Sequence, residues 1–207
     1  MGCAFCASTI AGKVRDLTPS EILDQVIFAQ KDSGLPISNI VLMGIGEPLD
    51  NYENVTKFLS LVSCPDGINI SQRNITLSTC GLADRIRKLA DDGFSVNITI
   101  SLHATTDEIR KTIMPIAYKY SIDEIIDACN YYAEKTGRRT SFEYTMIKSS
   151  NMGHFDALRL TGIAKRAKAH INLIMLNYVK EKNVKGCTEA EAQKFCKKLT
   201  DAGVNAT

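Results

Sequence analysis

Two cysteines stand close together at the start of the chain, in the segment MGCAFCAST. Cys3 and Cys6 are two residues apart, and this spacing can ligate zinc, hold part of an iron–sulfur cluster or form a redox dithiol. A zinc site needs two more closely spaced ligands, and His154 and His170 are too widely separated to supply them. A thioredoxin-like dithiol usually follows a strand, and no strand precedes Cys3. Purely structural thiols remain as a further alternative, so the spacing alone does not decide among these roles.

The composition indicates one globular domain and does not point to a particular binding partner. The chain has 207 residues, of which 44% are hydrophobic, enough for an α/β domain with a buried core. Its net charge of +2 requires no polyanionic partner. The absence of a long apolar run and of a signal-peptide pattern predicts a cytoplasmic protein that does not act at a membrane. Seven cysteines, an odd number without a secretory signal, argue against a disulfide framework.

Apolar runs rich in Ile, Val and Thr alternate with segments of helical periodicity. The runs predict strands over residues 39–44, 74–79, 96–103, 141–147 and 171–177. The periodic segments predict helices over residues 18–34, 52–62, 82–93, 121–137, 155–170 and 188–203, and a shorter helix over 107–115. Because each strand is followed by a helix, we expect right-handed crossovers and a parallel sheet.

One face of the predicted sheet is polar. In the strand 96–103, the even-numbered residues from Val96 to Leu102 are apolar and the odd-numbered residues from Asn97 to His103 are polar. A sheet covered by helices on both faces usually has nearly continuous apolar strands. The pattern therefore favours a partial barrel whose concave side is polar, with functional residues at the carboxyl ends of the strands.

Six segments, taken in order, resemble the radical S-adenosylmethionine (SAM) methyltransferases that modify adenine in RNA. They are GCAFCAS, MGIGEPLDNYENV, ITLSTCGL, ISLHATTDEIRKTIMPI, FEYTMI and NLIMLNYV, and the resemblance extends from Gly2 to about Val204. It implies an α/β fold, a partial (β/α)6 TIM-like barrel of the radical SAM type, here without its first strand. It also implies methylation of carbon 2 of adenosine in 23S rRNA and tRNA. Two alternatives stay open: methylation of carbon 8, as in antibiotic-resistance relatives, and a non-catalytic α/β binding domain with an incidental Cys-x-x-Cys.

The resemblance assigns Cys3 and Cys6 to a metal centre. The family's motif is Cys-x-x-x-Cys-x-x-Cys, and these residues match its second and third cysteines, so that the first would precede Met1. Three thiolates would hold a 4Fe-4S cluster and leave one iron free to chelate the methionine portion of SAM. With two of the three, residues 1–207 are expected to be an inactive core fragment of a longer enzyme. An accessory domain would precede this fragment.

The resemblance also implies SAM contacts, as well as residues that lie outside the chain. Gly46 and Glu47 would meet the methionine portion, with the Glu47 carboxylate accepting from the ammonium group. A tight turn at Gly46 and a helix cap at Glu47 are the structural alternatives. Phe5 would lie against adenine, or simply pack among apolar side chains. The other expected contacts are Ser78, Ser101, Leu102, His103 and Asn177.

In the family, one SAM methylates a cysteine near the carboxyl terminus, a second SAM initiates radical transfer of that methyl group, and an upstream cysteine resolves the adduct. Neither of these catalytic cysteines has a counterpart in the chain. The resemblance further implies a flavodoxin or ferredoxin as electron donor and a monomeric enzyme. Basic residues such as Lys111, Lys119 and Lys148 could contact RNA phosphates, although solvated surface positions are the more common explanation for such residues.

Overall fold

The computed structural model describes residues 1–148, 150–182 and 184–207. A five-stranded sheet runs through it, in the order β1-β2-β3-β4-β5, and every pair of neighbours is parallel. The strands are β1 (Ile40–Leu42), β2 (Ile75–Thr79), β3 (Asn97–Ser101), β4 (Thr140–Met146) and β5 (His170–Met175). Because spatial order follows chain order, right-handed crossovers place the connecting helices on one face of the sheet. This confirms the predicted partial barrel.

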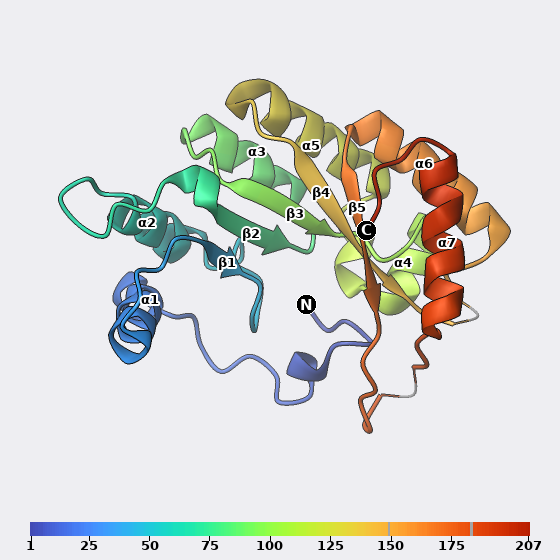
Figure 1. Cartoon of the computed structure of the whole chain (residues 1–207), viewed down its shortest axis with the longest axis horizontal. Coiled ribbons are helices and arrows are strands. Elements are labelled where there is room, and N and C mark those ends of the chain that lie inside the picture. The colour runs from blue at the N-terminus through green and yellow to red at the C-terminus, as the bar shows by residue number, and fades with distance from the viewer. Residues whose placement is uncertain (149, 183) are drawn as a thin grey trace.

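The helices that connect the strands cover the convex face of the sheet, whereas the amino-terminal segment crosses on the other side (Figure 1). A helix precedes the sheet and another follows it. The helices are α1 (Pro19–Ser33), α2 (Tyr52–Val62), α3 (Ala83–Asp91), α4 (Asp107–Ile113), α5 (Ile122–Thr136), α6 (His154–Ala167) and α7 (Glu189–Asp201). Three short 3-10 turns lie at Ala7–Thr9, Gln72–Asn74 and Pro115–Tyr118.

The predicted elements are confirmed, with differences at their ends. The strand predicted over residues 96–103 ends at Ser101, because His103 adopts a φ of 55° that cannot continue a strand. The helix predicted over residues 155–170 ends at Ala167. Lys168 caps it in the left-handed conformation, and His170 already belongs to β5.

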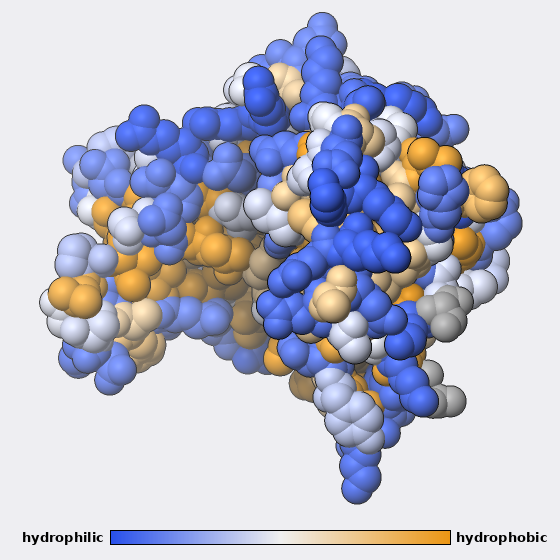
Figure 2. Space-filling view, turned by 45° about the vertical axis from the view of Figure 1, so that its right-hand side comes forward, coloured by the Kyte–Doolittle hydropathy of each residue, from blue (hydrophilic) through white to orange (hydrophobic). Residues whose placement is uncertain are grey.

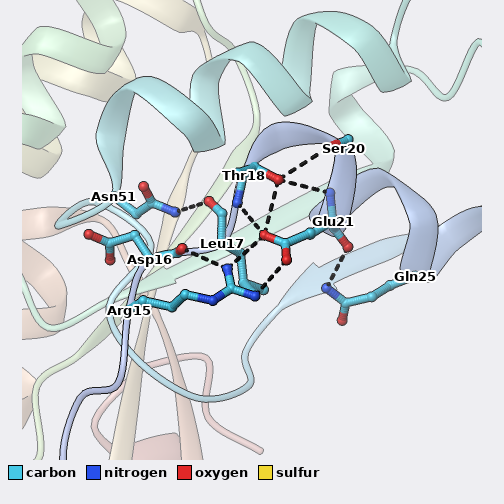
Figure 3. A network of polar contacts seen from close by, with 8 residues as sticks. All are labelled: Arg15, Asp16, Leu17, Thr18, Ser20, Glu21, Gln25 and Asn51. Atoms are coloured by element: carbon cyan, nitrogen blue, oxygen red, sulfur yellow. Dashed lines mark hydrogen bonds and ion pairs between the residues drawn. The ribbon is translucent and has the colours of Figure 1, made fainter.

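The start of α1 is fixed by a polar network (Figure 3). Thr18 and Glu21 form a capping box, and the Arg15 guanidinium holds the Glu21 carboxylate through contacts of 2.8 and 2.6 Å. Asn51 Nδ2 donates to the carbonyl of Leu17 at 2.8 Å, so the beginning of α1 is tied to the residue that precedes α2.

One face of the sheet is polar as the sequence predicts, and it is less buried than the apolar face at β2, whereas Thr99, Glu143 and Thr145 on β3 and β4 are buried. In β2, Ile75 and Leu77 are fully buried toward the helices, whereas Thr76 and Ser78 on the other face are half-buried. A polar network crosses the concave face of β3, β4 and β5. Within it, the Glu143 carboxylate accepts from Thr99 Oγ1 at 3.0 Å and from Asn172 Nδ2 at 2.8 Å.

The edge of the sheet at β1 is the least covered part of the fold. β1 has three residues, and Val41 within it is 58% exposed. Further large apolar side chains are exposed at Met43, Ile45 and, on α1, Phe28. Figure 2 shows apolar atoms gathered in a hollow of the left half of the molecule, where Figure 1 places β1. Among the described residues, no helix combines the length and the apolar character needed to span a membrane.

Candidate functional site

The loop that carries Cys3 and Cys6 packs against the carboxyl ends of the central strands. Cys3 is buried in a small apolar cluster with Ala104 after β3, Ile147 after β4, and Ile113 and Met114 at the end of α4. The amide of Ala4 donates to the carbonyl of Ile113 at 2.9 Å, which fixes the loop to α4. The two cysteines therefore lie on the rim where the sequence analysis expects the site.

The loop itself is closed by turns. The amide of Cys6 donates to the carbonyl of Cys3 at 3.3 Å, and Thr9 Oγ1 donates to the carbonyl of Cys6 at 2.8 Å. Lys182 Nζ, from the segment after β5, donates to Thr9 Oγ1 at 2.8 Å. The loop is thus held from both the α4 side and the β5 side, which limits the positions that its thiols can take.

A further cysteine lies beside Cys3. Cys80, directly after β2, packs against the apolar cluster that contains Cys3, and its thiol is the main cause of a lowered pKa at Cys3. The pKa of Cys80 is raised correspondingly, because that thiol keeps its proton and is also partly buried. The sequence suggests only a core or surface thiol at this position, and the structure shows it to be a neighbour of the expected metal ligand.

Glu47 is buried and holds the loop after β2 in place. Its Oε1 accepts from the amide of Leu49 at 3.0 Å and its Oε2 accepts from the amide of Cys80 at 2.6 Å. Burial raises the pKa of Glu47, while the two backbone hydrogen bonds oppose that shift. Gly46, directly before it, is exposed and has a φ of 93°, which a side chain would strain. The expected turn at Gly46 is therefore present, and Glu47 is bound to backbone amides from two loops.

His103 is held in an unusual conformation next to the cysteine loop. It is 5% exposed, and its Nδ1 accepts from the amide of Thr145 at 3.0 Å, so the neutral ring carries its proton on Nε2. Burial lowers the pKa of His103 to about 3, with a smaller contribution from Arg110. Its ring lies edge-on to Phe5 with centroids 4.9 Å apart. His103 therefore supports the loop as a neutral side chain.

Asn151 fixes the backbone around His103. Its side chain is fully buried, with Nδ2 donating to the carbonyls of His103 at 2.9 Å and Thr145 at 2.7 Å. Its Oδ1 accepts from the amide of Ile147 at 2.7 Å. The ends of β3 and β4 are thus joined through one amide group, which offsets the strain of the positive φ at His103.

The remaining expected SAM contacts lie at different depths. Ser78 and Ser101 are half-buried at the ends of β2 and β3, on the concave face. The side chain of Leu102 is fully buried in the main core, so only its backbone is available to a ligand, and its carbonyl already accepts from Arg110. Asn177 is exposed after β5 and follows Leu176, which packs against the cluster around Cys3.

Sequence reasoning missed Arg110, Asn151 and Cys80. Arg110 is fully buried and donates only to backbone carbonyls, so its partners cannot be identified from the sequence. A signal for Arg110 does exist, because it shares a helix face with the buried Ile113, three residues on.

The donor set fits two of the three thiolates that a cluster with one open iron requires. Cys3 and Cys6 project from one short loop, and the buried guanidinium of Arg110 lies within electrostatic range of Cys3. A positive charge at this depth suits a group with a net negative charge, such as a thiolate-bound cluster. In the described ranges, no three His, Cys, Asp or Glu side chains converge closely enough to hold a metal alone. A third thiolate for such a cluster would have to come from outside the described residues.

The sequence matches one protein family over most of its length. The profile of the Radical SAM superfamily matches residues 1–161, which include the cysteine loop and the ends of β2, β3 and β4. The chain belongs to the radical SAM superfamily.

Relatives within this superfamily cover the whole chain. A protein of Clostridium perfringens named "Probable dual-specificity RNA methyltransferase RlmN" is 56% identical over all 207 residues, which correspond to 60% of that protein. A protein of the same name from Lachnospira eligens is 52% identical, again over the whole chain and over 59% of the relative. The chain thus spans about three fifths of the length of these radical SAM relatives.

Solved radical SAM structures agree with the fold. A radical SAM methyltransferase from Sphaerobacter thermophilus superposes with a TM-score of 0.95 at 36% identity, covering 100% of this chain and 61% of the other. Streptococcus suis SuiB bound to S-adenosylmethionine gives a TM-score of 0.70 at 16% identity, covering 99% of this chain and 46% of the other. The second similarity concerns the fold alone.

Proposed function

We propose that the chain is the core of a radical SAM methyltransferase that methylates carbon 2 of adenosine in 23S rRNA and tRNA. The observation that carries this proposal is the docking of the Cys3–Cys6 loop on the same rim as Glu47, Ser101 and His103. The names of the closely similar relatives support RNA as substrate and methyl transfer as the reaction. The two cysteines of the methyl-transfer chemistry are expected outside residues 1–207, so that this chain alone is inactive.

Cys3 and Cys6 would hold a 4Fe-4S cluster together with a third cysteine from a longer chain. Bound there with SAM, the cluster supplies one-electron chemistry that the side chains of the protein cannot perform. Packing of Cys3 among Ala104, Ile113 and Ile147 excludes water from one side of the loop. Such exclusion strengthens the electrostatic interactions at the site.

The rim residues would bind SAM by complementary groups. Ser78, Ser101 and Asn177 offer hydroxyl and amide groups for the carboxylate, ribose or adenine of SAM. Gly46 leaves the backbone before Glu47 accessible to the methionine portion. Each Glu47 oxygen already accepts one amide, and each keeps a second lone pair for the ammonium group.

Phe5 would contact the adenine ring with the face that is not turned to His103. His103 would contribute chiefly through its backbone and by supporting Phe5, because its ring is buried. These placements give each expected contact a position on one rim.

The partners follow from this chemistry. The substrates would be 23S rRNA and tRNA, and a flavodoxin or ferredoxin would deliver the electron. We propose that the enzyme acts as a monomer in the cytoplasm, away from membranes.

The experiment is a methylation assay on the full-length protein that contains this chain, reconstituted anaerobically with iron and sulfide. Unmodified 23S rRNA and tRNA are incubated with SAM and a one-electron reductant, and the nucleosides are identified by mass spectrometry. We expect 2-methyladenosine from the wild type and from a Cys187→Ala control. We expect none from Cys3→Ala.

Two results would change the proposal. Formation of 8-methyladenosine would assign the chain to the carbon-8 enzymes instead. Absence of any methylated nucleoside, together with absence of the broad absorbance at about 400 nm expected of thiolate-bound clusters, would favour a non-catalytic binding domain.

A further inference from the structure

Arg110 is the most deeply buried charged residue of the described chain. Its relative exposure is 0%, although it lies on α4, a helix of seven residues at the surface of the rim. Its guanidinium points into the space between the ends of β2 and β3. Such burial of an arginine is rare unless another charge compensates it.

The hydrogen bonds of Arg110 all end on neutral acceptors. Nε donates to the carbonyl of Leu102 at 3.2 Å, and Nη2 donates to the carbonyls of Cys80 at 2.7 Å and Ser101 at 3.3 Å. Nη1 donates to the carbonyl of Tyr120 at 3.4 Å. Throughout residues 1–148, 150–182 and 184–207, no carboxylate lies within ion-pair distance of this guanidinium. Carbonyl dipoles solvate a cation, but they do not neutralise it.

The ionisable groups that act on Arg110 point to the cysteine loop. Cys80, Asp107 and Cys3 are the groups whose negative charge would stabilise the guanidinium. Asp107, at the start of α4, offsets part of this charge without contacting the guanidinium, and its Oδ1 accepts from the amide of Ile122 at 2.8 Å. The geometry places the guanidinium beside the cysteine loop, because Nη2 donates to the carbonyl of Cys80 at 2.7 Å and Cys80 packs against the apolar cluster that contains Cys3.

We propose that Arg110 is a positioning residue whose buried charge is the electrostatic partner of the thiolate-bound cluster and raises its reduction potential. This inference rests on the proposed function. A one-electron reduction makes the cluster and its thiolates more negative by one charge, and a fixed positive charge nearby stabilises the reduced state more than the oxidised state. The same guanidinium holds the ends of β2 and β3 at the spacing that SAM would meet, through the carbonyls of Cys80 and Ser101.

The test is a redox titration of the reconstituted full-length protein, followed by absorbance and electron paramagnetic resonance. Arg110→Gln removes the charge and keeps hydrogen-bond donors, whereas Arg110→Lys keeps the charge and loses the planar fork. We expect Arg110→Gln to lower the equilibrium constant for cluster reduction about tenfold, a shift of about 59 mV to more negative potential for a one-electron couple. Arg110→Lys should recover most of the wild-type potential.

A matched control removes a similar arginine contact away from the site. Arg138 Nε donates to the carbonyl of Ser95, before the amino end of β3, at 3.1 Å. Arg138→Gln should leave the potential unchanged. An unchanged potential in Arg110→Gln, or an equal loss in Arg110→Gln and Arg110→Lys, would overturn the proposal.

A second variant changes the charge near the cluster in the opposite direction. It keeps Arg110 unchanged, so its result does not depend on whether an Arg110 variant folds. Asp107→Asn keeps an oxygen for the amide of Ile122 and removes the negative charge that partly offsets Arg110. We expect its cluster potential to move in the positive direction. A negative shift or no shift would contradict the inference. Failure of the wild type to form any cluster would instead contradict the proposed function.

Discussion

Helices α1 and α5 have the same local signals and very different surroundings. Each has 15 residues, begins with a capping box and ends at a left-handed glycine, Gly34 with φ 67° or Gly137 with φ 69°. α5 buries six residues in the main core, beside α3 and α6, whereas α1 buries only Val26. Capping chemistry therefore determines where a helix begins and ends, and packing determines how much it contributes to the stability of the fold.

The difference also separates the two halves of the molecule. The ends of β2, β3 and β4 are joined by Glu47, Arg110 and Asn151, each of which is buried and bonds to backbone groups. Glu47 belongs to the loop after β1, but β1 itself lies at the open edge of the sheet, where the side chains of Val41 and Met43 are exposed. The rigid half is the one that carries the candidate site, as precise positioning of bound groups requires.

The largest expected contrast comes from one isoleucine in each helix. Ile125 of α5 is fully buried, and Ile27 of α1 is 43% exposed. Ile125→Ala should lower the free energy of unfolding by about 2–5 kcal/mol because it leaves a cavity. Ile27→Ala should change it by less than about 0.5 kcal/mol. Urea unfolding measures both, and equal losses would show that α1 and α5 contribute alike.

Asn151, at the strand-end rim, and the exposed Asn130 allow the same comparison between a buried and an exposed residue. Asn151→Ala leaves the amide of Ile147 and the carbonyls of His103 and Thr145 without a partner, and should cost about 2–3 kcal/mol. Asn130→Ala serves as the control, because Asn130 is exposed and makes one contact, to the carbonyl of Arg166 at 3.4 Å. A loss at Asn151 no greater than at Asn130 would refute its role in joining β3 and β4.

The pH dependence of stability reports on His103. Its pKa is about 3 in the folded protein, against about 6.5 in an unfolded chain. Between these values the unfolded state binds the extra proton, so stability is full above about pH 6.5 and falls by up to about 1.4 kcal/mol per pH unit as the pH decreases. The measurement is unfolding at pH 6.5 and pH 5, in the wild type and in a variant without this imidazole.

The variant His103→Gln isolates this contribution, because Glu47, whose pKa is raised, acts in the opposite direction over the same range. The difference in stability between wild type and His103→Gln should therefore depend on pH. A difference that stays constant from pH 6.5 to pH 5 would mean that His103 is not buried in its neutral form.

The smallest effect distinguishes the two capping boxes. Ser121→Ala should lower global stability by about 1 kcal/mol, because α5 unfolds only with the core. Thr18→Ala removes an equivalent cap, yet it should chiefly speed hydrogen exchange within α1 and leave global stability almost unchanged. Equal global losses would place α1 in the same cooperative unit as α5.

Much of the fold could be predicted because its signals are local. The alternation in residues 96–103 predicts the polar concave face, and Thr18 and Gly34 predict the bounds of α1. The position of Cys3 and Cys6 on the strand-end rim follows from the order of elements in a parallel sheet. These predictions rely on periodicity and capping, which involve neighbours within a few residues.

The residues that sequence reasoning missed bind backbone groups that are distant in sequence. Such groups are the same in every residue, so they cannot be recognised as partners from the sequence. Arg110 binds carbonyls at the ends of two strands and the carbonyl of Tyr120, two residues before α5, and every residue has a carbonyl. Asn151 could not be recognised from the sequence for the same reason, because its partners are backbone groups at the ends of β3 and β4. The buried side chain of Leu102 agrees with the apolar face that the alternation predicts, and it leaves only the backbone for the SAM contact that the resemblance implies.

The most direct test of the account is whether a cluster bound at Cys3 and Cys6 and SAM bound at the strand ends occupy one site. Electron paramagnetic resonance of the reduced full-length protein, recorded with and without SAM, measures this. We expect SAM to change the cluster spectrum in the wild type and in the edge variant Phe28→Ala, and a Glu47→Gln variant to require more SAM for the same change. A wild-type cluster spectrum that saturating SAM leaves unaltered would contradict the account.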